Sequence, residues 1–299
     1  MWEPPKSPYL VPFDGSFRVS RAPTGPPDGA PKKKDKKREL AELVAELDSL
    51  QAKLNADNRF SVLLVFQAID AAGKDGTIRA VLTGVNPAGC QVFSFKAPSE
   101  EELDHDFLWR VHRAVPERGR IGVLNRSHYE EVIVVRVHPE FLDAQRLPDE
   151  RRRGHRLDAL WRARYESIVS FEQHLARNGT VILKFWLNVS KREQCQRLLD
   201  RIEDERANWK FSARDIDERK LWAEYMTAYE HTLRATSRPW APWYAIPADD
   251  KRFMRMCVAD IVVRALRSLK LEFPVLSNDA REQLRKIRRS LQAQMKRDD

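Results

Sequence analysis

Five short apolar runs, separated by helical patterns, constrain the fold of this chain more than any other feature of its sequence. The first, residues 61–66, is a continuous run of the kind found in strands that are covered on both faces. Similar runs follow at residues 91–95, 121–124, 181–187 and 243–246. Strands that alternate with helices indicate βαβ units. The sequence therefore predicts an α/β fold in which a doubly wound parallel sheet is flanked by helices.

The first predicted strand runs into a loop that has the features of a phosphate-binding loop. Gly73 and Gly76 allow the backbone to turn tightly and approach a ligand, and the helix that follows would present free N–H groups to phosphate oxygens. Lys74 would neutralise charge on a phosphoryl group in transit. The loop departs from the Walker A pattern at both ends, because Ala68 replaces the first glycine and Asp75 replaces the usual Ser or Thr.

Two acids, Asp70 and Asp75, flank this anion site, where carboxylates alone would repel phosphate. The arrangement suits a cation that bridges carboxylate and phosphate, so Asp70 is the expected Mg²⁺ ligand. Asp75 is assigned to phosphate binding together with Gly73, Lys74 and Gly76. The alternative for Asp75 is that it only caps the helix.

Polar and charged residues also follow the third predicted strand. In phosphate-loop folds the carboxyl end of this strand faces the phosphate site. Arg126 is then placed to hold a phosphoryl group, and Glu130 or Glu131 to hold a metal or a nucleotide. The alternative is that this segment is an ordinary helix start.

Residues 190–238 are long, charged and helical in pattern, and they lie where a phosphate-loop kinase carries its lid. Arg197 and Arg201 are four residues apart and so share one helix face. Cations on a lid suit phosphoryl transfer, because they arrive when charge must be stabilised. Acidic residues interleave with these arginines, so a solvated charged face is the alternative.

The formal net charge of +9 favours an anionic partner, with nucleic acid, an anionic membrane surface and a polyanionic substrate as candidates. Cys90, Cys195 and Cys257 are far apart, which argues against a zinc site or a disulfide framework and favours a reducing compartment. The chain has no apolar stretch of about 18 residues, so no membrane span is expected. The expected location is the cytoplasm.

Several ordered motifs resemble those of the family-2 polyphosphate kinases. The resemblance covers residues 38–270. Its motifs are Asp70-Ala-Ala-Gly-Lys-Asp-Gly-Thr77, Gly84-Val-Asn-Pro87, Asn125-Arg-Ser-His-Tyr-Glu130, Lys184-Phe-Trp-Leu187, Trp209-Lys-Phe211, Thr236-Ser237, Ala241-Pro-Trp243 and Lys251.

The resemblance implies a thymidylate-kinase-like fold with a phosphate-loop core and a helical lid. It implies phosphoryl transfer between inorganic polyphosphate and adenine nucleotides, with Mg²⁺ or Mn²⁺ as cofactor. Asp70, Lys74 and Arg126 match the catalytic positions of the family, which bind the metal and the phosphates. Lid positions that bind phosphate match Arg197, Arg201 and Lys210. Members assemble as dimers or tetramers, a role that the amphipathic helix expected at residues 38–57 could serve.

One departure from the family pattern concerns the nucleotide end of the site. Many members carry aspartate at the position of Asn125, and an amide is a weaker metal ligand than a carboxylate. Asn125, Glu130 and Glu131 are therefore assigned to nucleotide binding, and Glu130 could supply the missing charge. The form Asn-Arg-Ser-His-Tyr-Glu is similar to the branch that phosphorylates both AMP and ADP. The alternatives are an ATP-dependent nucleoside monophosphate kinase and a non-enzymatic polyanion-binding module.

The expected domain plan has three parts. Residues 1–37 form an irregular, proline-rich and basic arm, because proline disrupts regular helix. Residues 38–274 form the kinase domain, with the lid at about 190–238. Residues 275–299 form a basic amphipathic helix whose apolar stripe packs or makes an oligomer contact. We expect a homo-oligomer that binds neither nucleic acid nor membrane.

Overall fold

The computed structural model describes residues 2–147, 157–206, 208–210 and 214–298. The strands are β1 (Ser61–Gln67), β2 (Cys90–Ser94), β3 (Ile121–Asn125), β4 (Thr180–Asn188) and β5 (Trp243–Pro247). They form a five-stranded sheet in the order β2-β3-β1-β4-β5, and each neighbouring pair is parallel. This confirms the predicted α/β fold, because every predicted run has become a strand.

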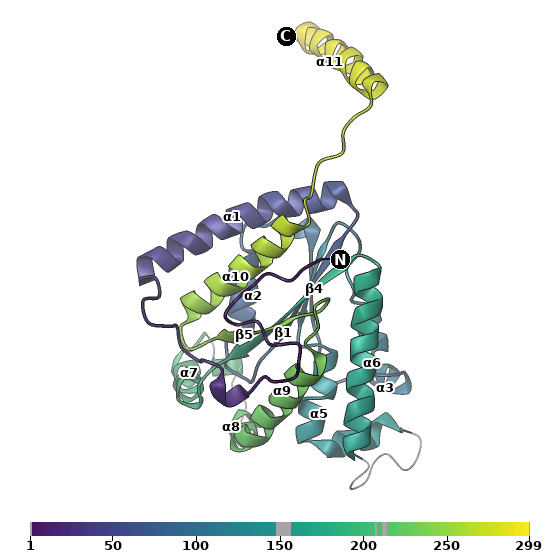
Figure 1. Ribbon diagram of the computed structural model, residues 1–299. Coiled ribbons are helices and arrows are strands. Elements are labelled where there is room, and N and C mark those ends of the chain that lie inside the picture. Colours follow the sequence, from purple (N-terminus) through teal and green to yellow (C-terminus); the bar gives the residue numbers. More distant parts are fainter. Residues whose placement is uncertain (1, 148–156, 207, 211–213, 299) are drawn as a thin grey trace.

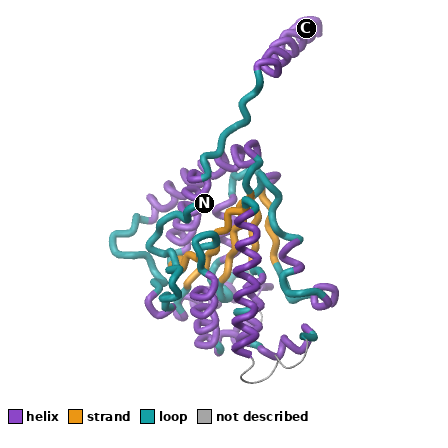
Figure 2. The backbone as a smooth tube through the Cα atoms, turned by 45° about the vertical axis from the view of Figure 1, so that its right-hand side comes forward, coloured by secondary structure: helices purple, strands orange, loops and turns teal. Residues whose placement is uncertain are grey.

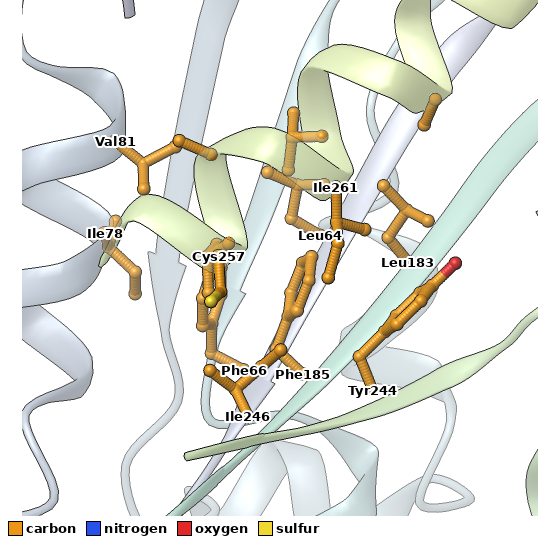
Figure 3. Close-up of a cluster of buried hydrophobic side chains, with 14 of the residues drawn as sticks. Leu64, Phe66, Ile78, Val81, Leu183, Phe185, Tyr244, Ile246, Cys257 and Ile261 are labelled. Carbon is orange, nitrogen blue, oxygen red and sulfur yellow. The ribbon is translucent and has the colours of Figure 1, made fainter. Parts of the chain in front are cut away.

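Helices cover both faces of the sheet (Figure 1). One layer contains α1 (Lys33–Asp57), α2 (Lys74–Leu82) and α10 (Lys251–Ser268), and the other contains α5 (Val134–Val137), α6 (Leu157–Arg177) and α9 (Trp222–Thr236). Side chains alternate between the layers along β1: Leu64 and Phe66 pack toward α10, whereas Leu63 and Val65 pack on the opposite side. Figure 3 shows the first of these cores, where sheet residues meet Ile78 of α2 and Ile261 of α10. Burial on both faces explains why β1, β3, β4 and β5 are continuous apolar runs in the sequence, whereas β2, at the edge of the sheet, is only partly buried.

The remaining helices are short or belong to the lid and the C-terminus. They are α3 (Glu100–Asp104), α4 (Trp109–His112), α7 (Lys191–Glu203), α8 (Arg214–Lys220) and α11 (Asn278–Asp298), with 3₁₀ turns η1 (Val19–Arg21), η2 (Pro87–Gly89), η3 (His128–Glu131), η4 (Pro139–Gln145) and η7 (Asn208–Lys210). A capping box starts α3: Ser99 and Glu102 bond reciprocally there. The helical pattern expected for the lid is also present in α7, α8 and α9.

The N-terminal arm lies along one edge of the sheet, and Figure 1 shows it as the dark purple trace that leads from the N-terminus across the molecule. The amide of Val11 donates to the carbonyl of Trp243 at 2.9 Å, and the amide of Ala245 donates to the carbonyl of Tyr9 at 2.8 Å. The arm therefore occupies the free edge of β5, which would otherwise present unpaired backbone groups.

The start of α1 corrects one expectation. The helix begins at Lys33, within the basic run that was expected to belong to an irregular arm ending at residue 37. Lys36 is buried, and its Nζ lies 2.6 Å from Asp250 Oδ2 at the N-terminus of α10. This ion pair joins the starts of the two helices and explains why the helical structure extends further than the apolar pattern indicated.

The two amphipathic helices at the ends of the chain differ in what covers them. On the apolar side of α1, Leu47 and Leu54 are buried in the core that α10 lines, whereas Leu40, Leu43 and Leu50 are partly buried; the oligomer contact that the resemblance implied for this helix stays a prediction. Helix α11 projects from the body of the molecule (Figures 1 and 2), and its Leu284 and Leu291 are more than half exposed. Within the described residues, no helix has the length and hydropathy needed to cross a membrane.

Candidate active site

The phosphate loop, residues 68–76, connects β1 to the first turn of α2. Gly73 caps α2 with φ of +100°, a left-handed conformation that favours glycine. A Cβ at this position would also lie only 3.3 Å from Met254 Cε. Because the first amides of a helix have no intrahelical partner, the start of α2 can bind an anion.

The predicted catalytic residues meet at the carboxyl edge of the sheet. Asp70 and Arg126 follow the neighbouring strands β1 and β3, and Arg126 Nη2 lies 3.0 Å from Asp70 Oδ1. Arg126 Nη1 lies 3.5 Å from Glu130 Oε2. Lys74 reaches back across the loop, where its Nζ donates to the carbonyl of Ala68 at 2.9 Å. The strand order thus brings together residues that are 56 positions apart in the chain.

The charges in this group affect one another. Burial and the positive charge of Arg126 hold the pKa of Lys74 below its usual value, against the opposing effect of Asp70 and Glu130. Burial raises the pKa of Glu130, although Arg126 and Lys74 act in the other direction. Cations and acids are therefore close enough to exchange their internal pairs for a phosphate and its counter-ion.

Arg126 has a strained backbone. Its φ is +66°, which is uncommon for a residue other than glycine. The amide of Arg126 donates to the carbonyl of Phe66 at 3.3 Å, which extends the pairing of β3 with β1 by one residue. Strain of this kind is retained where a side chain must point in one direction, as in a functional site.

Asn125 lies at the rim of a hollow beside the phosphate loop. Its Nδ2 donates to Asp75 Oδ1 at 2.8 Å and to Ser94 Oγ at 3.3 Å. Asp75 therefore contacts the end of β3, and its side chain does not cap α2. The hollow has a volume of about 380 Å³, and its lining residues are Asp75, Ile78, Arg79, Leu82, Thr83, Val92 and Asn125.

Glu131 does not join this group, which contradicts its expected role in nucleotide binding. It is 4% exposed, and its carboxylate accepts a hydrogen bond from Gln145 Nε2 at 2.7 Å and pairs with Arg164 at 3.3 Å. The 3₁₀ turn η3 directs Glu130 toward Arg126 and Glu131 into the opposite side of the fold. Glu131 therefore has a structural role.

Arg197 on the lid helix α7 is buried and fully bonded to the protein. Its Nη1 donates to the carbonyls of Ala71 and Ala72, and its Nη2 donates to those of Ala248 and Asp249, at 2.5–3.4 Å. Its Nε donates to Glu193 at 2.7 Å. These bonds use all the donors of a guanidinium. In this arrangement Arg197 holds the phosphate loop in place, and direct binding of phosphate by Arg197 stays a prediction.

Arg197→Gln is expected to lower the free energy of unfolding by about 2 kcal/mol, because buried carbonyls lose charged hydrogen-bond donors. Urea unfolding would measure the change. Arg192→Gln on the same helix is the control, since Arg192 is exposed. Equal stability of the two variants would contradict a structural role for Arg197.

The other predicted lid cations are less closely tied to the phosphate loop. Arg201 Nη1 lies 3.2 Å from Asp215 Oδ2 and so connects α7 to α8. The backbone of Lys210 belongs to η7, but its side chain lies outside the described residues.

Two sets of charged residues near the site were not predicted from the sequence. The first is a group of cations, Arg79, Lys251, Arg252 and Arg255, of which Lys251 was known only as part of a motif. Arg79 lies in the last turn of α2, and the other three lie in the first turns of α10, where their close spacing is a signal that could have found them. The second is the buried pair Lys184–Glu172, at 2.6 Å. A lysine within an apolar run indicates such a partner, because an unpaired buried charge is costly.

Comparisons with known proteins give matches over most of the chain. A family model described as Polyphosphate kinase 2 (PPK2) matches residues 30–274. The ADP-polyphosphate phosphotransferase of Rhodopseudomonas palustris is 53% identical over 248 residues, which are 83% of this chain and 85% of the relative. The AMP/ADP-polyphosphate phosphotransferase of Meiothermus ruber is 43% identical over 267 residues, 89% of this chain and 94% of the relative. The crystal structure of polyphosphate kinase 2 from Arthrobacter aurescens superposes with a TM-score of 0.82 at 36% identity, covering 91% of this chain and 93% of that one.

Proposed function

The chain belongs to the polyphosphate kinase 2 family, and we propose that it transfers phosphoryl groups between inorganic polyphosphate and adenine nucleotides. The observation that carries this proposal is the convergence of Asp70, Lys74 and Arg126 on the phosphate loop. Two cations and a carboxylate beside the start of a helix form a site that can bind a phosphoryl group while it is transferred from donor to acceptor. We assign AMP and ADP as acceptors, so the enzyme makes ADP and then ATP.

In the proposed mechanism the end of a polyphosphate chain occupies the phosphate loop. Lys74 leaves the carbonyl of Ala68 and, with Arg126, neutralises charge on the phosphoryl group in transit. The attacking atom is a phosphate oxygen of the nucleotide, which is already ionised at neutral pH, so no strong general base is needed. As this oxygen bonds to the terminal phosphorus, the bond from that phosphorus to the bridging oxygen breaks, and polyphosphate leaves one phosphate shorter. Catalysis is then mainly alignment and electrostatic stabilisation.

We propose Mg²⁺, or Mn²⁺, as the cofactor. Mg²⁺ commonly uses one or two carboxylates and completes its shell with water and phosphate. Asp70 fits this role, since its side chain is 36% exposed at the end of β1. When bound, the ion would neutralise charge on the phosphate oxygens. Glu130, beside Arg126, could add a second carboxylate.

The test is to incubate the purified protein with Mg²⁺, long-chain polyphosphate and either AMP or ADP, and to separate the nucleotides by chromatography. ATP from both acceptors would support the proposal. ATP from ADP alone would keep the reaction and exclude AMP as an acceptor. Phosphorylation of AMP only when ATP is supplied would instead identify a nucleoside monophosphate kinase.

We also propose that the enzyme acts in the cytoplasm as a homo-oligomer. Free thiols at Cys90, Cys195 and Cys257 suit a reducing compartment. The exposed apolar side chains of α11 provide a surface on which a second copy could pack. Light scattering of the full chain would measure the oligomer number.

A further inference from the structure

Gln194, in the first turn of α7, connects the lid to the phosphate loop. Its Nε2 donates to the carbonyl of Asp70 at 3.1 Å, and its Oε1 accepts from Arg219 Nη1 of α8 at 2.6 Å. The residue is 4% exposed, and both ends of its amide are bonded within the protein. Buried polar side chains that are bonded in this way hold their partners in place. Gln194 is therefore positioned to act through Asp70 and not on a substrate directly.

Arg219 decides which end of this amide faces the phosphate loop. A guanidinium has only donors, so the oxygen of Gln194 turns toward Arg219, and the N–H group turns toward Asp70. Arg219 Nη1 also donates to the carbonyl of Lys191, the first residue of α7, at 2.8 Å. The arginine thus fixes both the start of α7 and the orientation of the glutamine.

Helix α8, which carries this arginine, is anchored at two further points. It lies beside α7 at the lower left of Figure 1, where its Asp215 pairs with Arg201 of α7 at 3.2 Å. Nearer its end, Glu218 Oε2 lies 2.8 Å from His138 Nε2, in the turn between α5 and η4. Because α8 is held by these contacts, the amide of Gln194 has a partner with a fixed position.

The phosphate loop is strained where the glutamine contacts it. Ala71 has a φ of +62°, which is uncommon for a residue other than glycine. Such a conformation persists only where the surrounding structure holds it. Gln194 bonds the carbonyl of the preceding residue, and Arg197 bonds the carbonyls of Ala71 and Ala72. Two side chains of α7 therefore maintain the backbone that presents Asp70.

Asp70 is held by two contacts that differ in what happens to them during transfer. Its carboxylate pairs with Arg126 at 3.0 Å, but in the proposed mechanism Arg126 engages the phosphoryl group. The bond from Gln194 is made to the backbone of Asp70, so it can persist while Arg126 changes partner.

We propose that Gln194 is a positioning residue for Asp70, and that Arg219 orients Gln194 from the lid. The inference rests on the proposed function for the role of Asp70 as the Mg²⁺ ligand. It extends that function, because it makes the position of the metal ligand depend on the placement of α8. Contacts that orient a metal ligand affect both the affinity for the metal and the activity.

Gln194→Met tests this role, because methionine keeps the length of the side chain and removes both hydrogen bonds. We expect kcat for transfer to ADP to fall about tenfold and the half-saturating Mg²⁺ concentration to rise about tenfold, the scale of losing a contact that orients a metal ligand. KM for polyphosphate should change little. The matched control is Gln196→Met, an exposed glutamine of the same helix whose Nε2 bonds Asp200 at 2.9 Å. This control should keep the values of the wild type.

Hydrogen exchange of the free protein gives a readout that does not depend on turnover. In Gln194→Met the backbone amides of residues 68–76 should exchange about tenfold faster, because the loop opens locally more often, whereas the amides of β4 keep the rates of the wild type. The exchange rates in Gln196→Met should equal those of the wild type in both segments.

Substitutions at Arg219 test whether the two residues act as one unit. Arg219→Met leaves Gln194 in place and should lower kcat by less than Gln194→Met does. The double variant should lose no more kcat than Gln194→Met alone, because both changes act through one contact. Arg219→Lys keeps a cationic donor and should recover most of the activity that Arg219→Met loses.

Several outcomes would overturn the positioning role. They are normal kcat and Mg²⁺ dependence in Gln194→Met, an equal loss in Gln196→Met, additive losses in the double variant, and unchanged exchange in the loop. A fall in kcat without a change in Mg²⁺ dependence would also overturn it, since Asp70 would then have kept its position. If Gln194→Met did not fold, Arg219→Met would decide by the same measurements. A wild type without turnover, in which Gln194→Met still speeds exchange in the loop, would refute the proposed function and leave the positioning of the loop standing.

Discussion

Asp70→Asn is expected to lower kcat for transfer from polyphosphate to ADP by at least about 10²-fold, the scale of losing one contact that stabilises the transition state. Asparagine keeps the shape of the side chain but removes the charge that orients Arg126 at 3.0 Å and that we assign to Mg²⁺. The effect on stability should be small, at most about 1 kcal/mol, because both partners of this ion pair are partly exposed. Steady-state kinetics and urea unfolding of the same preparation separate the two effects.

The control for Asp70→Asn is Asp260→Asn. Asp260 pairs with Arg264 at 2.6 Å on α10, so its replacement also breaks an Asp–Arg pair, but the pair lies outside the active site. This variant should retain the turnover of the wild type. If Asp70→Asn also retained near-normal turnover, Asp70 would be neither a metal ligand nor a catalytic residue.

Much of the fold could be predicted because four of its five described strands are buried on both faces. The continuous apolar runs at β1 and β4 are typical of strands that are covered on both faces. The start of α1 could not be placed in the same way, since its first turn is held by an ion pair between Lys36 and Asp250, which lies far along the chain. The order of the N-terminal arm depends similarly on the free edge of β5, which no local pattern in the arm reveals.

In the site, too, the residues placed by local sequence could be predicted, and those placed by distant contacts could not. Asp70, Lys74 and Arg126 could be predicted because each follows a recognisable strand, and the ends of neighbouring parallel strands meet. Glu130 and Glu131 are adjacent acids, and the turn η3, which the sequence did not reveal, decides which of them faces Arg126. The contacts of Arg197 could not be predicted, because its partners lie in the phosphate loop and in the segment before α10.

Lys184→Met is expected to lower the free energy of unfolding by about 3–5 kcal/mol, as for the loss of one partner from a buried ion pair. Lys184 is fully buried in β4, and its Nζ donates to Glu172 at 2.6 Å, Tyr129 at 2.7 Å and the carbonyl of Thr236 at 2.8 Å. Burial lowers the pKa of Lys184 to about 8, with Glu172 opposing the shift, so the pair is charged at neutral pH. Methionine fills most of the volume but leaves the Glu172 carboxylate buried without its cation. Urea unfolding at neutral pH measures the loss.

A second substitution distinguishes the lost ion pair from a packing defect. Lys184→Met with Glu172→Gln removes both charges and should recover much of the stability, because no unpaired carboxylate is then buried. Lys220→Met is the surface control: Lys220 pairs with Asp217 at 2.8 Å but is 72% exposed, so the expected loss is at most about 1 kcal/mol. If Lys184→Met were as stable as the wild type, Glu172 would have to be neutral in the variant. Burial, which raises the pKa of a carboxyl group, would then have replaced the ion pair with a bound proton.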